Sequence, residues 1–275
     1  MLRSLVALLA VVLVLYAAFV LLLWATQTQL VFPAPRAALP DPARHGFPAG
    51  RRVEVRAADG TTLRGWYVPP DGDGRGPALL WFYGNAETVA YDAPVFRALL
   101  PERWGLLVLD YHGYGASDGE PSEAGLHLGA DAAWDFLAAQ PGVDPARIAV
   151  YGRSLGSVPA LHLAVTRPVR AVALDSPFSS GREMARVHYW FVPPLLVRLE
   201  LDNLARARRL GETGTPLLVF HGRGDVIAPV AMGRAVAEAG RGRLVELGGG
   251  HNETYGDLAG YRRVLHAFLA SAAAN

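Results

Sequence analysis

The sequence contains no cysteine and no lysine, and these two absences narrow the chemistry open to the chain. Without cysteine there can be no disulfide, no thiolate-bound metal and no cysteine nucleophile. All 26 basic residues are arginine, which we interpret as a coding bias toward arginine and alanine. The 25 acidic residues balance them to a formal net charge of +1, which gives no electrostatic reason to expect nucleic acid as a partner.

Charge is also missing from the N-terminal stretch, where Leu5 to about Ala25 contains no charged residue, proline or glycine. An apolar helix of this length can cross a hydrocarbon core of about 30 Å. Trp24 occupies a place where an interfacial aromatic ring is expected. A cleaved secretory signal would have a shorter apolar region and a small-x-small cleavage site after it. We therefore interpret residues 1–26 as an uncleaved transmembrane signal anchor.

The arginines around this segment give little information on its orientation. Arg3 lies before it and Arg36 and Arg44 lie after it, so the positive charges on the two sides nearly balance. The few residues that precede the segment are easier to retain in the cytoplasm than a whole domain. We therefore expect a single-pass protein whose folded domain lies outside the cytoplasm. Residues 27–50 are rich in proline and are predicted to form an extended connector that lies on the domain.

Residues 51–275 are long enough for one α/β domain, and their pattern alternates between short apolar runs and longer amphipathic stretches. Val53–Arg56 and Leu63–Val68 are predicted to form an antiparallel hairpin. Continuous apolar strands separated by helices indicate a mostly parallel sheet that is covered on both faces. Further strands are predicted at Ala78–Tyr83, Gly105–Tyr111, Arg147–Tyr151, Val169–Leu174, Pro216–His221 and Leu244–Leu247, and helices near Val89–Leu100, Glu123–Ala139, Leu155–Thr166, Val230–Ala239 and Tyr255–Ala272.

The interval 178–212 interrupts this alternation, because it is too long for a simple crossover between two strands. We interpret it as a small cap or lid over the domain. For four of its large apolar residues, two interpretations stay open: they hold an acyl chain near the membrane, or they pack the cap on the core. These residues are Trp190, Phe191, Leu195 and Leu196.

A Gly-x-Ser-x-Gly motif occurs twice, around Ser154 and around Ser117. In a nucleophile elbow the serine follows a strand directly and begins a helix, and the two glycines remove side chains where helix and strand crowd each other. Ser154 meets both conditions, since it lies between the strand-like Ile148–Tyr151 and the helical Leu155–Thr166. Ser117 follows a loop and is soon followed by a proline. We therefore predict Ser154 as the nucleophile.

The two partners that a serine nucleophile needs follow it along the chain. A serine hydroxyl attacks poorly until a base removes its proton, and the base needs a carboxylate that fixes its tautomer. Asp225 lies in a glycine-rich loop after one predicted strand, and His251 lies in a glycine-rich loop after the next. The order Ser, acid, His is that of α/β-hydrolase sites at the carboxyl ends of parallel strands. We predict His251 as the general base and Asp225 as the orienting acid.

Other polar residues compete for these roles. Asp175 also ends a strand and is the alternative orienting acid, although hydrogen bonding to loop backbone is the role that we favour for it. His221 ends a strand and is expected to be buried and hydrogen-bonded. His112 follows a strand and is a candidate to line the site, and His188, in the predicted cap, is a candidate to contact substrate.

An acyl-transfer site also needs preorganised donors for the oxyanion of the tetrahedral intermediate. The N–H of Leu155, directly after the nucleophile, is the first predicted donor. The loop after strand Ala78–Tyr83 supplies the second, and there we assign the N–H of Asn85. A plain strand-to-helix turn would explain the glycine at position 84 equally well.

Together these residues resemble the membrane-anchored α/β-hydrolase-domain proteins, a family that includes lysophospholipases and acyl-protein thioesterases. The resemblance runs from the anchor to the last helix and implies the α/β-hydrolase fold and a serine hydrolase. Two positions depart from the family pattern: Tyr83 stands where relatives have histidine, and His112 stands where they have arginine. The motifs that carry the resemblance are Tyr83–Ala86, Asp110–Gly119, Pro121–Glu123, Gly152–Gly156, Gly222–Asp225 and Gly250–Asn252.

The sequence therefore predicts an enzyme that hydrolyses carboxylic esters or thioesters of small or lipid-like acyl compounds, in the carboxylesterase, thioesterase and lysophospholipase class. We expect it to need no cofactor and no metal. Cleavage of amides or peptides by the same residues is one alternative. A non-catalytic binding module tethered to the membrane is the other. Halide and epoxide specialists are disfavoured, because those chemistries place aspartate where this chain has Ser154.

Overall fold

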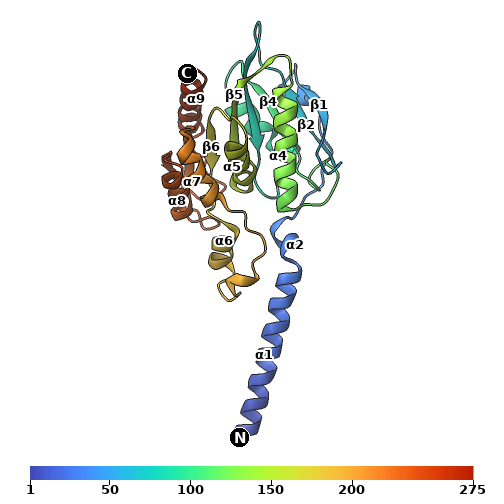
Figure 1. Cartoon of the computed structure of the whole chain (residues 1–275), viewed down its shortest axis with the longest axis vertical. Coiled ribbons are helices and arrows are strands. Elements are labelled where there is room, and N and C mark those ends of the chain that lie inside the picture. The colour runs from blue at the N-terminus through green and yellow to red at the C-terminus, as the bar shows by residue number, and fades with distance from the viewer. Residues whose placement is uncertain (275) are drawn as a thin grey trace.

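The computed structural model of the chain describes residues 1–274, which form one eight-stranded sheet with helices on both faces (Figure 1). The strands are β1 (Arg51–Arg56), β2 (Thr62–Val68), β3 (Gly76–Phe82), β4 (Gly105–Leu109), β5 (Val143–Arg153), β6 (Val172–Asp175), β7 (Leu217–Gly222) and β8 (Arg243–Leu247). Their order across the sheet is β1-β2-β4-β3-β5-β6-β7-β8. The β1–β2 and β2–β4 pairs are antiparallel and the other pairs are parallel.

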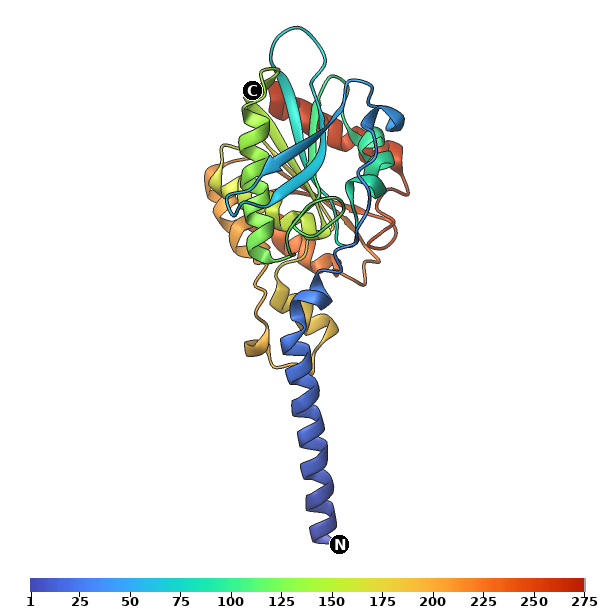
Figure 2. The same cartoon turned by 90° about the vertical axis from the view of Figure 1, so that its right-hand side faces the viewer.

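The helices form one layer on each face of the sheet and a separate N-terminal stalk. They are α1 (Leu2–Ala25), α2 (Gln27–Val31), α3 (Val89–Leu99), α4 (Glu123–Ala138), α5 (Ser157–Thr166), α6 (Gly181–His188), α7 (Asn203–Thr213), α8 (Val230–Ala239) and α9 (Leu258–Ala274), with short 3₁₀ turns η1 (Pro42–His45), η2 (Ser154–Gly156) and η3 (Pro194–Leu196). Helices α4, α5, α7 and α8 pack in a row on one face, and α3 packs with α9 on the other (Figure 2).

The predicted strands and helices are confirmed, with boundaries that move by a few residues. The hairpin has the predicted antiparallel pairing, with Val55 opposite Leu63. Strand β5 begins at Val143, earlier than expected, and reaches Arg153. The central strands are buried on both faces, as continuous apolar parallel strands must be. This mostly parallel sheet, covered on both faces, is the architecture that the sequence predicts.

The connector 27–50 differs from the extended segment that was predicted. Its first residues, before any proline occurs, continue as the short helix α2, and Pro42–His45 form a 3₁₀ turn. A proline at the first position of that turn has no N–H to lose, which makes the turn an acceptable place for it. The remainder lies on the domain as expected, since Trp66 Nε1 donates to the carbonyl of Pro40 at 2.9 Å.

The interval 178–212 contains two different parts. Helix α7 packs against α5 and α8, so it belongs to the helix layer of the domain. Helix α6, turn η3 and the chain between them project from the carboxyl end of the sheet toward α1 (Figures 1 and 2). We use the name cap segment for residues 181–201, which are the projecting part.

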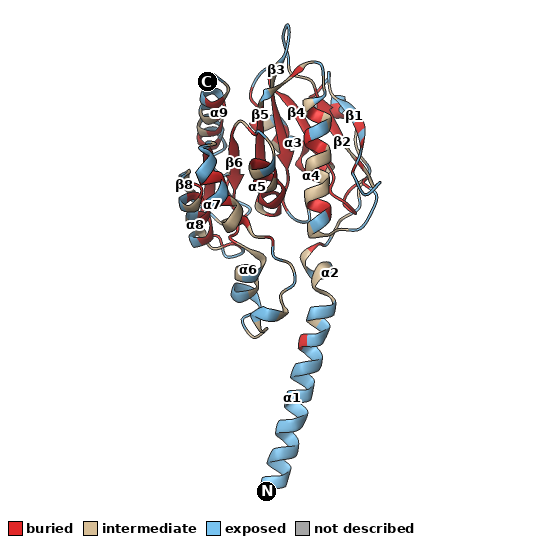
Figure 3. Ribbon diagram, viewed as in Figure 1, coloured by how far each residue is buried: buried red, intermediate tan, exposed pale blue. Residues whose placement is uncertain are grey.

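Helix α1 stands away from the domain, and nearly all of its residues are exposed (Figure 3). The mean hydropathy of 3.1 in an 18-residue window of α1 and its 24 residues are sufficient for a membrane crossing. At 1.5 Å per residue the helix is about 36 Å long. Its C-terminal end lies below the carboxyl edge of the sheet, beside the cap segment.

Candidate active site

Ser154 lies at a sharp turn between β5 and α5 and has a positive φ of 48°. Few residues other than glycine adopt this conformation, and it marks a strained turn of the kind that presents a nucleophile. The flanking glycines are needed for space. A Cβ on Gly156 would lie 2.1 Å from the carbonyl oxygen of Phe82, and a Cβ on Gly152 would lie 2.5 Å from that of Gly156. The local sequence therefore builds the elbow that was predicted.

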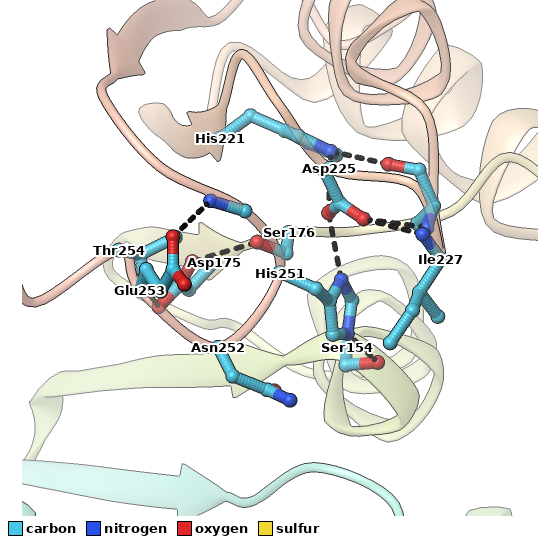
Figure 4. A network of polar contacts seen from close by, with 12 residues as sticks. Ser154, Asp175, Ser176, His221, Asp225, Ile227, His251, Asn252, Glu253 and Thr254 are labelled. Atoms are coloured by element: carbon cyan, nitrogen blue, oxygen red, sulfur yellow. Dashed lines mark hydrogen bonds and ion pairs between the residues drawn. The ribbon is translucent and has the colours of Figure 1, made fainter.

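The three residues predicted as nucleophile, base and acid lie in one line (Figure 4). His251 Nε2 is 2.9 Å from Ser154 Oγ, and His251 Nδ1 is 2.7 Å from Asp225 Oδ2. Ser154 follows β5, Asp225 follows β7 and His251 follows β8. The carboxyl ends of these three strands lie at one edge of the sheet. Because Asp225 accepts from Nδ1–H, Nε2 carries the lone pair and faces the hydroxyl of Ser154.

Asp225 is surrounded by donors. Its Oδ1 accepts from the N–H of Ile227 at 2.9 Å and from that of Ala228 at 2.8 Å. Burial by itself would raise the pKa of the Asp225 carboxyl, but hydrogen bonds from His221, His251 and Ala228 outweigh it and hold the pKa well below its usual range. The carboxylate is therefore charged throughout the neutral range, as an orienting acid must be.

His221 is buried and hydrogen-bonded, as predicted, but its position was not foreseen. Its Nε2 lies 2.7 Å from the carbonyl oxygen of Ala228 and 3.1 Å from Asp225 Oδ2. A carbonyl only accepts, so Nε2 carries the proton and the ring holds the loop that contains Asp225. The only sequence signal for this role was the spacing of four residues between His221 and Asp225.

Asp175, the alternative acid, forms no hydrogen bond with His251 among the described residues. Its predicted bonds to loop backbone are wrong as well, because its partners are side-chain hydroxyls. Thr254 donates to Asp175 Oδ2 at 3.0 Å, and Tyr151 does so at 3.3 Å. Asp175 therefore supports the loop that carries His251 without touching the imidazole.

Ser117, in the second Gly-x-Ser-x-Gly motif, has a structural role. Its Oγ donates to the carbonyl of Asp110 at 2.6 Å and accepts from the N–H of Arg64 at 2.9 Å. The side chain is fully buried. His112 is also buried, beside Asp59 and away from the cavity described below, so the prediction that it lines the site is wrong.

The two residues predicted to supply oxyanion donors lie beside Ser154. Leu155 begins the turn after Ser154, and Asn85 follows β3, the neighbour of β5. Among residues 1–274, no hydrogen bond within the chain uses either backbone N–H. The side chain of Asn85 accepts from the hydroxyl of Tyr114 at 2.7 Å and donates to the carbonyl of Val31 at 2.5 Å. These bonds fix the loop and tie it to α2.

Arg153 joins the loops of the site in a way that sequence reasoning missed. Its guanidinium pairs with Glu87 in the loop after β3, and it donates to Asn252 Oδ1 at 2.8 Å and to the carbonyl of His251 at 3.2 Å. Glu87 in turn accepts from the N–H of Gly84 at 2.5 Å. Arg153 is buried, so this ion pair fixes the position of the His251 loop relative to the Asn85 loop. No motif indicated this ion pair and its hydrogen bonds, because Glu87, Arg153 and the loop of His251 are far apart in sequence.

Asp92 lies buried at the base of this ion pair. Burial raises the pKa of the Asp92 carboxyl to about 8, with a further contribution from the neighbouring Glu87 carboxylate and an opposing one from Arg153. At neutral pH Asp92 is therefore protonated. Its proton allows it to stand beside Glu87 without repulsion.

A cavity of about 440 Å³ opens next to Ser154, a volume typical of small-ligand sites. His251, Asn85 and Leu155 border it at the same end. His188 borders it too, and it stays a candidate to contact substrate. The cap segment covers much of the rest with apolar side chains. These are Met184, Ala185, Tyr189, Val192, Val197 and Leu199.

The four cap residues selected from the sequence are not among those that border the cavity. Trp190 and Leu195 are 81% and 83% exposed, the ring of Phe191 stacks on Phe19 of α1, and the carbonyl of Leu196 accepts from Gln27 of α2. Both interpretations of these residues, as an acyl-binding wall and as packing on the core, are therefore wrong. The chain of the cap turns its neighbouring residues inward, and the sequence alone did not reveal which side faces the cavity.

No group of three or more histidine or acidic side chains within residues 1–274 is arranged to hold a metal ion. The hydroxyl of Ser154 faces the imidazole of His251, and this pairing suits proton transfer during acyl transfer.

Known proteins share this architecture and parts of this sequence. Residues 77–199 match the family described as alpha/beta hydrolase fold. The chain is 40% identical over 247 residues to the uncharacterized protein Rv2307c of Mycobacterium tuberculosis, covering 89% of this chain and 87% of that one. It is 31% identical to alpha/beta hydrolase domain-containing protein 17B of Xenopus laevis over 72% of this chain and 67% of the relative.

Among solved structures, the Pyrococcus furiosus esterase Pf2001 superposes with a TM-score of 0.68 at 19% identity. The superposition covers 86% of this chain and 98% of that one. At this identity the likeness concerns the fold. Sheet order, elbow and sequence relatives agree, and the chain belongs to the α/β-hydrolase family.

Proposed function

We propose that the chain is a serine hydrolase that cleaves carboxylic ester or thioester bonds of acyl substrates through an acyl-enzyme intermediate. The observation that carries this proposal is the hydrogen-bonded series Asp225–His251–Ser154 at the wall of an apolar cavity. A fatty acyl chain suits such a cavity better than a peptide does, because peptide amides would lose their hydrogen bonds to water there.

In the first half of the proposed reaction, His251 Nε2 takes the proton of Ser154 as Oγ attacks the acyl carbonyl. The N–H groups of Asn85 and Leu155 stabilise the oxyanion of the tetrahedral intermediate. The charged Asp225 stabilises the imidazolium that forms. As the intermediate collapses, the bond to the leaving alcohol or thiol breaks, and the imidazolium returns the proton to that leaving group.

In the second half, a water molecule enters beside His251. The imidazole removes a proton from it, the resulting hydroxide attacks the acyl carbonyl, and Ser154 Oγ leaves with the proton from His251. The free acid is released and the serine is restored. The two half-reactions use only side chains of the protein, backbone N–H groups and water.

We further propose that α1 is retained as a single-pass membrane anchor and that the domain lies outside the cytoplasm. The length of α1, its apolar composition and its exposure support the first part. The orientation rests on the short N-terminal head. Because the chain lacks cysteine, a single Glu212→Cys substitution at an exposed position gives a unique label. The proposal predicts that a membrane-impermeant maleimide labels Glu212→Cys in sealed spheroplasts, and labelling only after lysis would contradict the orientation.

The nucleophile is tested with a fluorophosphonate probe on the full-length chain in detergent. The wild-type chain is expected to be labelled, and Ser154→Ala is expected to abolish both labelling and hydrolysis of p-nitrophenyl acetate. Ser271→Ala, at an exposed position in α9, is the matched control and should label normally. Labelling or turnover that survives in a folded Ser154→Ala variant would refute the assignment.

A further inference from the structure

The cavity beside Ser154 has a wall that the α/β domain does not supply. Besides the cap segment, α1 and α2 border it through Leu23, Trp24, Gln27, Leu30 and Val31. Four of these five side chains are apolar. The end of the proposed anchor therefore stands at the place where the acyl chain of a substrate would lie.

A polar contact joins this part of the anchor to the cap segment. The side-chain amide of Gln27 donates to the carbonyl of Leu196 at 2.7 Å and accepts from the N–H of Arg198 at 2.9 Å. Arg198 donates to the carbonyl of Trp24 at 3.0 Å, and its guanidinium lies 4.6 Å from the centre of the Trp24 ring. These bonds satisfy backbone groups that no secondary structure pairs, and they close the cavity between anchor and cap.

The cap segment also contacts α1 well before its C-terminal end. The hydroxyl of Tyr16 donates to the carbonyl of Phe191 at 2.6 Å, and the rings of Phe19 and Phe191 stack with centres 6.0 Å apart. Tyr16 lies nine residues before Ala25, where α1 ends, which corresponds to about 14 Å along the helix. The tip of the cap segment (residues 189–197) thus runs beside a part of α1 that a membrane-spanning helix would place in the bilayer.

The residues at this tip are apolar and exposed. Trp190 and Leu195 are among the most exposed large apolar side chains outside α1 in the described residues. Exposed apolar side chains gathered next to a transmembrane segment are favourable when lipid covers them, and tryptophan is common at that depth. The continuity of this surface with α1 identifies its partner as the lipid bilayer.

We propose that the C-terminal end of α1, together with α2, is a wall of the substrate site, and that the tip of the cap segment is immersed in the bilayer. The pocket then receives a membrane-resident acyl ester or thioester sideways from the lipid. Its acyl chain lies against Trp24, Leu30 and the cap, its carbonyl lies at Ser154, and its polar leaving group faces water. This inference rests on the proposed hydrolase function and adds the source of the substrate and the residues that select its chain length.

The pocket wall is tested with the full-length chain in lipid nanodiscs, using p-nitrophenyl acetate and p-nitrophenyl dodecanoate. Leu30→Trp puts bulk into the cavity from α2. We expect kcat/KM for the dodecanoate to fall about tenfold, roughly the loss of two buried methylene groups, while the rate for the acetate stays within about twofold. Leu22→Trp, on the exposed side of α1 and outside the cavity lining, is the matched control and should change neither rate.

If Leu30→Trp lowers kcat/KM equally for both esters, or for neither, the proposal that α2 forms a wall of the substrate site is wrong. The variant Ser154→Ala separates this result from a failure of the proposed function. If acetate hydrolysis depends on Ser154 while Leu30→Trp does not discriminate by chain length, the hydrolase stands and the inference is wrong. If acetate hydrolysis survives in Ser154→Ala, the proposed function itself is wrong.

Immersion of the cap tip is tested with a fluorophore on a single introduced cysteine in the same nanodiscs. At Leu195→Cys we expect quenching by nitroxides attached to lipid acyl chains and little quenching by aqueous iodide. At Glu212→Cys, on the exposed surface of α7, the reverse is expected. A label at residue 195 that is quenched by iodide as strongly as the label at residue 212 would show that the tip lies in water.

Discussion

The loops around Ser154 and the cap segment lie side by side, but they are held by different forces. The loops bury Asp225, His251 and Arg153, and they are fixed by short hydrogen bonds and by the ion pair of Arg153. The cap segment leaves large apolar side chains exposed, and its most specific contacts are with α1 and α2. In our proposal the first region keeps its geometry without a membrane, whereas lipid completes the second. On this proposal the chemistry is therefore separable from the selection of the substrate.

The largest effect is expected from the acid of the site. Asp225→Asn should lower kcat on p-nitrophenyl acetate by about four orders of magnitude, because the imidazole loses the partner that fixes its tautomer. Asp175→Asn, which reaches the His251 loop only through Thr254, should cost at most about tenfold, the scale of one hydrogen bond. Circular dichroism verifies that both variants are folded. A larger loss of kcat for Asp175→Asn than for Asp225→Asn would indicate that Asp175, and not Asp225, orients His251.

The next effect concerns the ion pair that joins the loops. Arg153→Gln leaves the partly buried Glu87 carboxylate without its partner and should lower the free energy of unfolding by about 3 kcal/mol. Urea unfolding in detergent measures this loss. The double variant Arg153→Gln, Glu87→Gln should recover part of it, since the lone charge is gone. If the single variant is as stable as the wild-type chain, this ion pair does not hold the site together.

A pH-dependent effect is expected at Asp92. Its folded pKa of about 8 exceeds the ordinary value of 3.8, so folding takes up a proton between these values. The wild-type chain therefore loses stability as pH rises from about 4 toward 8, by up to about 1.4 kcal/mol per pH unit. Asp92→Asn removes this dependence. The variant should therefore raise the unfolding temperature above that of the wild-type chain by more at pH 8 than at pH 5. An equal change at both pH values would contradict a protonated Asp92.

The smallest effect is expected from the cap. Tyr16→Phe removes one hydrogen bond to Phe191 and should lower the local opening free energy by about 1 kcal/mol. Hydrogen exchange of the backbone amides of residues 189–197 in nanodiscs should accelerate several-fold, while acetate hydrolysis stays unchanged. Exchange at the wild-type rate would mean that α1 does not hold the cap.

The sequence predicted the two regions unequally, and the difference has a physical cause. Ser154, Asp225 and His251 were found because each follows a parallel strand, and parallel strands bring their carboxyl ends to one edge of the sheet. Arg153, Glu87 and the contact of His221 with Asp225 were missed, because side-chain pairing across loops leaves no periodic signal.

The orientation of the cap was not predictable in the same way. Beyond α6 its chain has only the short turn η3, and its partner is a helix that lies more than 150 residues earlier in the sequence. Only the structure shows that the ring of Phe191 and the backbone of Leu196 contact α1 and α2, while Tyr189 and Val192 border the cavity. The same limit applies to α2, which the prolines of the connector concealed.

The most direct test of the account is to locate the adduct that a long-chain alkyl fluorophosphonate forms with the full-length chain. Trypsin cleaves after Arg153, so Ser154 begins a peptide of its own, while Ser117 falls in a different one. Tandem mass spectrometry should place the phosphonate on Ser154, and His251→Ala should abolish the adduct. An adduct on Ser117, or one on Ser154 that forms equally fast without His251, would contradict the claim that the imidazole activates this hydroxyl.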